Sequence, residues 1–288
     1  MTVTLIENLV FPEGPRWHEG ALWFSDMHQH KVFHLVPGEP LAEVASFDDR
    51  PSGLGFLEDG TPVVVLMRSC RLVRFGPRGQ HLHCDLAPLG GTHLNDMVMA
   101  GNGNAYVGLR HHTASASDRV SPESVVLVRP DGSHQIVAED MWGPNGSAIS
   151  PDGRTLVVAE TRAGRISAFT IAADGTLSDR RVFAQMDGAP DGLCLDAEGA
   201  VWVGNVFNGR FERIVEGGEV VQTIQVADGK WAVACVLGDA DRRTLMMLTA
   251  HETVEHFFGL TDFEADLNST SRGYVECAKV PVPGAGRP

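Results

Sequence analysis

Short apolar runs of strand length recur along the whole chain, and each is entered through a polar turn. The runs are alternating or continuous in their apolar residues, which is typical of half-buried or fully buried β-strands. No long stretch has the periodicity of a helix. Six runs follow a turn that ends in or near glycine: HEGALWFSD (18–26), EDGTPVVVL (58–66), GNGNAYVG (101–108), PDGRTLVVAE (151–160), AEGAVWVGN (197–205) and DADRRTLMML (239–248).

The turns repeat at a nearly constant interval of roughly forty to fifty residues, which is the length of a four-stranded propeller blade. Asp-Gly and Glu-Gly are also the residues that tight hairpins prefer. The pattern therefore predicts an all-β fold, a six-bladed β-propeller that forms a single domain over residues 1–288. The repeated turn positions are Gly20, Gly60, Gly103, Gly153, Gly199 and Arg242.

A β-sandwich is the competing architecture, but its strands would be irregularly spaced. In a propeller we expect GYVECAKVPV (273–282) to pair with TVTLIENL (2–9), because an open ring would leave long apolar edges. The polar stretch RHHTASASDRVSPE (110–123) has no strand pattern and is predicted to be a long loop. Such loops often contribute to binding sites, and a solvated loop without function is the equal alternative.

Composition narrows the class of partner. A net charge of −14 argues against nucleic acid and anionic membrane surfaces, since both require a basic protein surface. No apolar run is long enough to span a bilayer, and the N-terminal segment has no secretory signal pattern. The five cysteines are scattered without CxxC spacing and are expected to be reduced. We therefore expect a cytoplasmic protein that acts on a small molecule.

One position recurs at the start of the strand that precedes each turn, which in a propeller is the strand nearest the central channel. Rotational pseudosymmetry would point the side chains at this position towards one axis. Two carboxylates and an amide on one axis would be unfavourable unless a cation is bound between them. Counted back seven or eight residues from the turn, the position holds Glu13, Ser52, Asn95, Asn145, Asp191 and, in the sixth unit, Ala234.

A set of oxygen ligands suits a hard divalent cation, so the sequence predicts a central metal site. Ca²⁺ is the first expectation, with Mg²⁺ or Mn²⁺ as alternatives. Zn²⁺ is a further alternative, although it more usually has His or Cys ligands. Asn145 and Asp191 are also ordinary turn residues, and either one alone would be explained in that way. Three such residues in the same repeat position, with Glu13 as the third, favour a site.

Longer motifs support this interpretation: FPEGPRW and LWFSD in the first unit, LND in the third, GPNGSAISPDGRTLVVAE in the fourth and APDGLCLDAEGAVWVGN in the fifth. In these motifs the chain resembles the SMP-30/gluconolactonase/luciferin-regenerating-enzyme family over essentially its whole length. The resemblance implies a six-bladed propeller with one divalent metal in its channel. It implies Glu13, Asn145 and Asp191 as ligands and Asn95 near the metal or the substrate. It also implies hydrolysis of lactones, particularly sugar lactones.

One residue departs from the family pattern. Sugar-lactone members often have Arg two residues before the Asn of the third unit, where this chain has His93, and this weakens the prediction of a sugar acid lactone. Arg68 and Glu160 directly follow apolar strands, and we expect them at the mouth of the pocket, with surface positions as the alternative. Trp142 and Met97 would suit a substrate less polar than a free sugar lactone.

The predicted chemistry is metal-assisted hydrolysis. A divalent cation polarises a lactone carbonyl and lowers the pKa of a bound water. We expect Asp191 to be the general base for that water, and His93 or His111 to assist proton transfer to the leaving alkoxide. The segment HETVEH (251–256) is not an HExxH motif, because its histidines are five residues apart and it lies in no evident helix.

Two other classes of function stay open. The same metal propeller could hydrolyse organophosphates or other esters, or catalyse a lyase or cyclase step. It could also be a non-catalytic propeller that binds a ligand around a structural metal. The acidic residues at the channel favour an enzyme, so the sequence predicts a divalent-metal-dependent lactone hydrolase.

Overall fold

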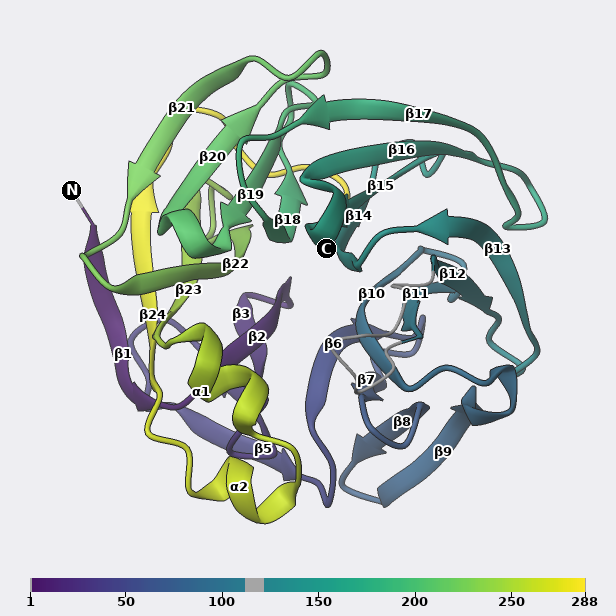
Figure 1. Cartoon of the computed structure of the whole chain (residues 1–288), viewed down its shortest axis with the longest axis horizontal. Helices are drawn as coiled ribbons and strands as arrows, with labels where there is room; N and C mark the ends of the chain where they lie inside the picture. Colours follow the sequence, from purple (N-terminus) through teal and green to yellow (C-terminus); the bar gives the residue numbers. More distant parts are fainter. Residues whose placement is uncertain (1, 112–121, 288) are drawn as a thin grey trace.

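The computed structural model describes residues 2–111 and 122–287, and its strands form six four-stranded antiparallel sheets. Figure 1 shows the sheets arranged around a common axis as the blades of a propeller. The predicted all-β, six-bladed architecture is confirmed. No helix in the described ranges is both long enough and apolar enough to cross a membrane.

In each of the first five blades the strands follow one another in sequence from the axis outwards. Blades 1 to 3 contain β2 (Pro12–His18), β3 (Ala21–Asp26), β4 (Lys31–Leu35) and β5 (Ala42–Ser46); β6 (Pro51–Phe56), β7 (Pro62–Leu66), β8 (Arg71–Gly76) and β9 (Gly79–Asp85); and β10 (His93–Met99), β11 (Ala105–Arg110), β12 (Glu123–Val128) and β13 (His134–Met141). Blades 4 and 5 contain β14 (Pro144–Ile149), β15 (Thr155–Glu160), β16 (Arg165–Ile171) and β17 (Leu177–Gln185); and β18 (Pro190–Leu195), β19 (Val201–Asn205), β20 (Arg210–Ile214) and β21 (Val220–Gln225).

The sixth blade combines the two ends of the chain. It contains β22 (Lys230–Gly238), β23 (Thr244–His251), β24 (Arg272–Lys279) and, as its outermost strand, β1 (Val3–Leu9). β1 runs antiparallel to β24, with Val3 opposite Cys277 and Leu9 opposite Gly273. This pairing leaves no open edge between the first and last blades.

The turn that joins the first two strands of each blade has the same backbone conformation in all six. A positive φ is readily adopted by glycine, which explains why five of the six predicted turn positions are glycine. The φ angles are +80° at Gly20, +80° at Gly60, +81° at Gly103, +72° at Gly153, +79° at Gly199 and +52° at Arg242. The repeat identified in the sequence is thus a repeat of backbone geometry.

The innermost strands are β2, β6, β10, β14, β18 and β22, and each has an irregularity near its beginning. In blade 4 the pairing of β14 with β15 shifts register between Pro144 and Ser147, and in blade 5 the shift lies between Pro190 and Leu193. The other four innermost strands have comparable shifts. A β-bulge re-aims a side chain out of the regular alternation. These shifts coincide with the repeated polar position, so Asn145 and Asp191 leave the sheet pattern there.

In blades 1, 2, 4 and 5 glycine follows this polar position, because neighbouring innermost strands approach each other closely there. A Cβ atom on Gly146 would lie 2.5 Å from the Asp191 carbonyl oxygen, and one on Gly192 would lie 2.2 Å from Ala234 Cβ. Neither side chain would fit without a backbone shift. The Pro–X–Gly form of the motif is therefore a packing requirement as well as a turn signal.

Apolar residues of adjacent blades fill the space between the sheets. Val157 and Ala168 of blade 4, for example, share a buried cluster with Leu193 and Val203 of blade 5. Close packing of this kind holds the first strands of all blades in fixed positions around the axis. The channel-facing side chains therefore start from a rigid frame.

Two short helices interrupt the sixth blade between β23 and β24. They are α1 (Val254–Gly259) and α2 (Phe263–Leu267), and the expectation that HETVEH lies in no helix is wrong for its last three residues, 254–256. The Thr253 and Asp262 side chains accept hydrogen bonds from backbone amides of the first turns and so cap the helices. Helices of this length carry too few residues to show periodicity. Single 3₁₀ turns are η1 (Ala87–Leu89), η2 (Thr161–Ala163) and η3 (Val206–Asn208).

Candidate functional site

A cavity of about 760 Å³ lies at the end of the channel where the innermost strands begin. Four of the repeated polar positions contribute to its wall: Glu13 of β2, Asn95 of β10, Asn145 of β14 and Asp191 of β18. Ser52 and Ala234 occupy the equivalent positions in blades 2 and 6 and are buried. The cavity thus brings together the three expected metal ligands and Asn95.

Glu13 and Asp191 are acids in a buried setting, each only 7% exposed. Burial raises the pKa of Asp191 to about 7; the charge of Asp96 raises it as well, whereas Arg110 and Asn145 lower it. Burial, followed by the charges of Asp191 and Asp96, raises the pKa of Glu13 well above its ordinary value. The protein by itself therefore resists ionisation of both carboxyls, and a bound cation would reverse this.

The polar atoms around these acids are only partly satisfied. Asp191 Oδ1 is buried and has no hydrogen-bond partner within the described part of the chain. The side-chain nitrogen of Asn145 donates to Thr161 Oγ1 at 3.1 Å, and the Thr161 hydroxyl donates to the Pro190 carbonyl at 2.8 Å. The Asn145 nitrogen is thereby engaged, which leaves the amide oxygen for another ligand. A buried acceptor without a partner costs about 1–3 kcal/mol, and a charged one costs more.

Arg110, at the end of β11, lines the same cavity and is a residue that the sequence analysis missed. It pairs with His93 across β10 and β11, and its Nε is buried without a hydrogen-bond partner in residues 2–111 and 122–287. Its charge lowers the pKa of both Glu13 and Asp191, while burial lowers the pKa of Arg110 itself. Its place directly after an apolar strand was the available signal, the same one that singled out Arg68 and Glu160.

The residues expected to bind substrate separate into two groups. Asn95, His93, His111 and Arg68 line the cavity. Asn95 also donates its side-chain amide to the Pro144 carbonyl at 3.3 Å, which ties it to the neighbouring blade.

Glu160 lies elsewhere, fully buried within blade 4 and apart from the described lining of the cavity. Its carboxylate accepts hydrogen bonds from Arg165 at 2.9 Å, from Arg180 at 2.8 Å and from Ser167. Burial alone would raise the pKa of Glu160, but the Arg165 and Ser167 hydrogen bonds and the charge of Arg180 bring it below its ordinary value. This geometry fits a structural ion pair within blade 4. Glu160 therefore does not lie at the pocket mouth, where it was expected.

The apolar part of the cavity comes from residues other than those expected. Met97 is fully buried in the core, and Trp142 is half-buried with its backbone amide donated to Glu160. The aromatic residues that line the cavity are Phe11, Phe207, Trp231, Phe257 and Phe258. They were missed because they belong to segments that meet only in the folded propeller.

No group of three or more His, Cys, Asp or Glu side chains is placed to hold a metal ion in the part of the chain that the structure describes. The cavity has two such acids, Glu13 and Asp191, and its third expected ligand is the amide of Asn145. A central metal centre would therefore need mixed oxygen ligands, two carboxylates and one amide.

Comparison with known proteins agrees with this architecture. The family model described as the SMP-30/Gluconolactonase/LRE-like region matches residues 11–251. A 6-deoxy-6-sulfogluconolactonase of Pseudomonas putida is 26% identical over 97% of this chain and 94% of its own length. Regucalcin of Xenopus laevis is 32% identical, covering 83% of this chain and 82% of regucalcin. The crystal structure of the calcium-binding protein regucalcin from Agrobacterium tumefaciens superposes with a TM-score of 0.73 at 21% identity, over 96% of this chain and 93% of that one.

Proposed function

The chain belongs to the SMP-30/gluconolactonase/LRE family, and on that basis we propose that it is a divalent-metal-dependent hydrolase of a lactone. The observation that carries this proposal is the unpartnered Asp191 Oδ1 beside Glu13 and Asn145 in one cavity. The sulfogluconolactonase relative supports the reaction class.

The residues at the channel fit a divalent cation. Two acids whose pKa values stay raised despite the charge of Arg110, and an amide whose nitrogen is already engaged, form an oxygen donor set that the protein only partly compensates. Ca²⁺ suits such donors best, with Mg²⁺, Mn²⁺ and Zn²⁺ as alternatives. In this proposal Glu13, Asn145 and Asp191 hold the ion.

When bound, the cation would supply Lewis acidity for the lactone carbonyl and for the attacking water. Asp191 has a second carboxylate oxygen that takes the proton from this water. His93 or His111 returns a proton to the alkoxide that leaves when the acyl–oxygen bond breaks. Arg110 orients the polar end of the substrate by donating hydrogen bonds to it, because a guanidinium has donors and no acceptor. The product is the open-chain hydroxy acid.

The test is acid release from a panel of lactones that includes gluconolactone, with a simple ester and a phosphotriester as representatives of the alternative reactions. Exhaustive chelation should abolish turnover, and one of the four cations should restore it. Glu13→Gln and Asp191→Asn should each lower kcat/KM, while Glu58→Gln, an exposed acid of the blade 2 turn, should behave as the wild type. Lactone hydrolysis that survives chelation would contradict the proposal.

A further inference from the structure

The cavity has two chemically different halves. Most of its basic side chains come from blades 2 to 4, and most of its apolar ones come from blades 5, 6 and 1, although Met67 of blade 2 is apolar. The basic half contains Arg50, Arg68, His93, Arg110, His111 and Arg162. The apolar half contains Phe11, Met27, Val206, Phe207, Trp231, Phe257, Phe258 and Leu260.

The aromatic rings of the apolar half form one connected cluster. The Trp231 ring lies 5.0 Å from Phe207 in a T-shaped arrangement and 5.6 Å from Phe257, which lies 5.0 Å from Phe11. These separations are those of favourable aromatic pairs. Phe207 and Phe258 nevertheless remain 51% and 65% exposed. Exposed aromatic side chains at the rim of a cavity are typical of a surface that binds an apolar group.

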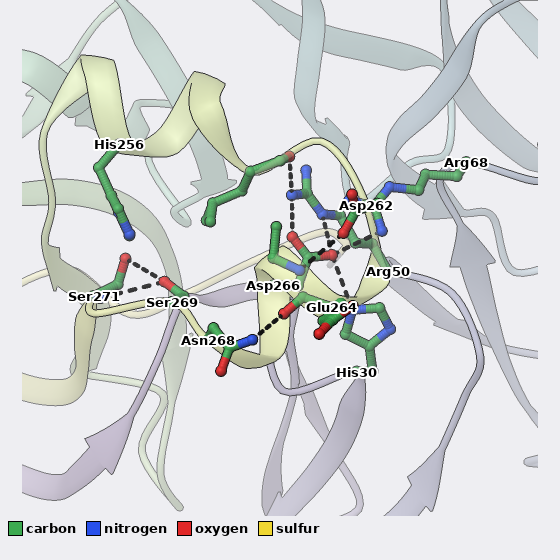
Figure 2. A network of polar contacts seen from close by, with 12 residues as sticks. His30, Arg50, Arg68, His256, Asp262, Glu264, Asp266, Asn268, Ser269 and Ser271 are labelled. Atoms are coloured by element: carbon green, nitrogen blue, oxygen red, sulfur yellow. Dashed lines mark hydrogen bonds and ion pairs between the residues drawn. The ribbon is translucent and has the colours of Figure 1, made fainter.

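The helical insertion that carries Phe257 and Phe258 is anchored to blades 1 and 2, the two blades that follow blade 6 around the ring. Figure 2 shows Asp266 of α2 surrounded by His30 from blade 1 and by Arg50 and Arg68 from blade 2. The Asp266 carboxylate is buried and lies 2.8 Å from Arg50 Nε, 2.8 Å from Arg68 Nη1 and 2.9 Å from His30 Nε2. Arg50 also donates to the Leu260 carbonyl at 2.7 Å. One carboxylate thus fixes α2 against two blades.

The two ends of the insertion are also linked to each other. The Glu252 carboxylate, just after β23, contacts His256 Nδ1 at 2.7 Å and the hydroxyl of Ser271, just before β24. Both ends and the tip of the segment are therefore held. An aromatic surface fixed in this way loses little conformational entropy when a ligand packs on it.

We propose that the substrate carries a planar apolar group, best an aromatic ring, which packs between Phe207, Trp231 and Phe258 while the lactone ring faces Glu13 and Asp191. This inference rests on the lactone hydrolase function proposed above and specifies its substrate class. Phe207 and Phe258 are then the residues that determine specificity. The basic half would face the polar end of the same molecule.

The experiment compares γ-phenyl-γ-butyrolactone with γ-butyrolactone, which share the same lactone ring. Wild-type kcat/KM should favour the phenyl compound by about tenfold or more, since tenfold corresponds to about 1.4 kcal/mol, the size of one good aromatic contact. The double variant Phe207→Ala/Phe258→Ala should reduce that ratio towards one. Leu267→Ala is the matched control, because Leu267 is 57% exposed on the same insertion and lies outside the described lining of the cavity.

Calorimetric binding of the ring-opened acids, 4-hydroxy-4-phenylbutyrate and 4-hydroxybutyrate, provides a readout that does not depend on turnover. The phenyl acid should bind more tightly to the wild type, and the double variant should lose the difference. Equal kcat/KM values for the two lactones together with equal binding of the two acids would overturn the inference. If neither lactone is hydrolysed with any divalent cation but the phenyl-dependent binding is present, the proposed function fails and the aromatic subsite stands.

Discussion

Asp191→Asn is expected to make the metal-free protein more stable at pH 8 and to change its stability little at pH 4. Burial raises the pKa of Asp191 from 3.8 to about 7 in the folded protein, and the unfolded chain keeps the ordinary value. At a pH between these two pKa values, the folded state retains a proton that the unfolded chain has released. The stability that this carboxyl contributes is therefore complete below about pH 4 and is lost as the pH rises through about 7.

The size of the effect follows from the two pKa values. The difference between 3.8 and about 7 corresponds to about 4 kcal/mol of unfolding free energy above pH 7. Asparagine has nearly the same shape and no charge, so the variant lacks this penalty. Removing the Asp191 charge also relieves Glu13, whose pKa burial and Asp191 together raise. Both effects stabilise the variant at alkaline pH.

Urea unfolding in excess chelator, followed by far-UV circular dichroism from pH 4 to 8, measures this directly. Asp228→Asn, which changes an exposed acid, is the control and should follow the wild-type curve. Addition of a saturating divalent cation at pH 8 should stabilise the wild type far more than Asp191→Asn. The contrary result is a variant that is no more stable than the wild type at pH 8 in chelator. That result would refute the inference that ionised Asp191 destabilises the metal-free fold.

Three further outcomes are expected. Arg110→Met should raise the pKa of Asp191 further, since Arg110 lowers it, and should shift the midpoint of the metal-free stability curve to higher pH; an unmoved midpoint would contradict the electrostatic role of Arg110. Asp266→Asn leaves two arginines without their buried partner and should cost about 3–5 kcal/mol in urea unfolding, with faster hydrogen exchange in residues 252–271; unchanged stability would show that the anchor is dispensable. Burial lowers the pKa of His28 to about 3, so the folded state cannot take up the proton that the unfolded chain binds below about 6.5. His28→Phe should therefore raise Tm more at pH 5 than at pH 8, and an equal change at both would be evidence against this.

The sequence was sufficient for the repeat because one local requirement recurs in every blade. A left-handed turn residue and a glycine at the close approach of two strands both leave a direct mark, as Gly153 and Gly146 illustrate. The grouping of Glu13 with Asp191 in one cavity followed from that periodicity. These features recur at equivalent positions of successive blades, so comparing the repeats within one sequence is enough to find them.

Other features depend on contacts between distant segments and left no such mark. Arg110 and Glu160 occupy the same place after an apolar strand, yet Arg110 turns into the cavity while Glu160 is captured by Arg165 and Arg180. The charged residues on the adjacent strands decide whether such a side chain enters the cavity or forms an ion pair within its blade. The partners of Asp266 are more remote still, 216 residues away at Arg50. No local pattern predicts a contact of that range.

The pairing of β1 with β24 determines the order in which the molecule can be completed. Val3 leaves the ribosome long before its partner Cys277 is synthesised. At 5–20 residues per second, β1 waits roughly 15 to 55 seconds before this partner is synthesised. Trp231 and the helical insertion belong to the same blade, so the aromatic side of the cavity can be completed only after residues 230–279 have been synthesised. The strands of blades 1 to 5 are synthesised earlier, and blade 6 then adds Trp231, Phe257 and Phe258 to the pocket.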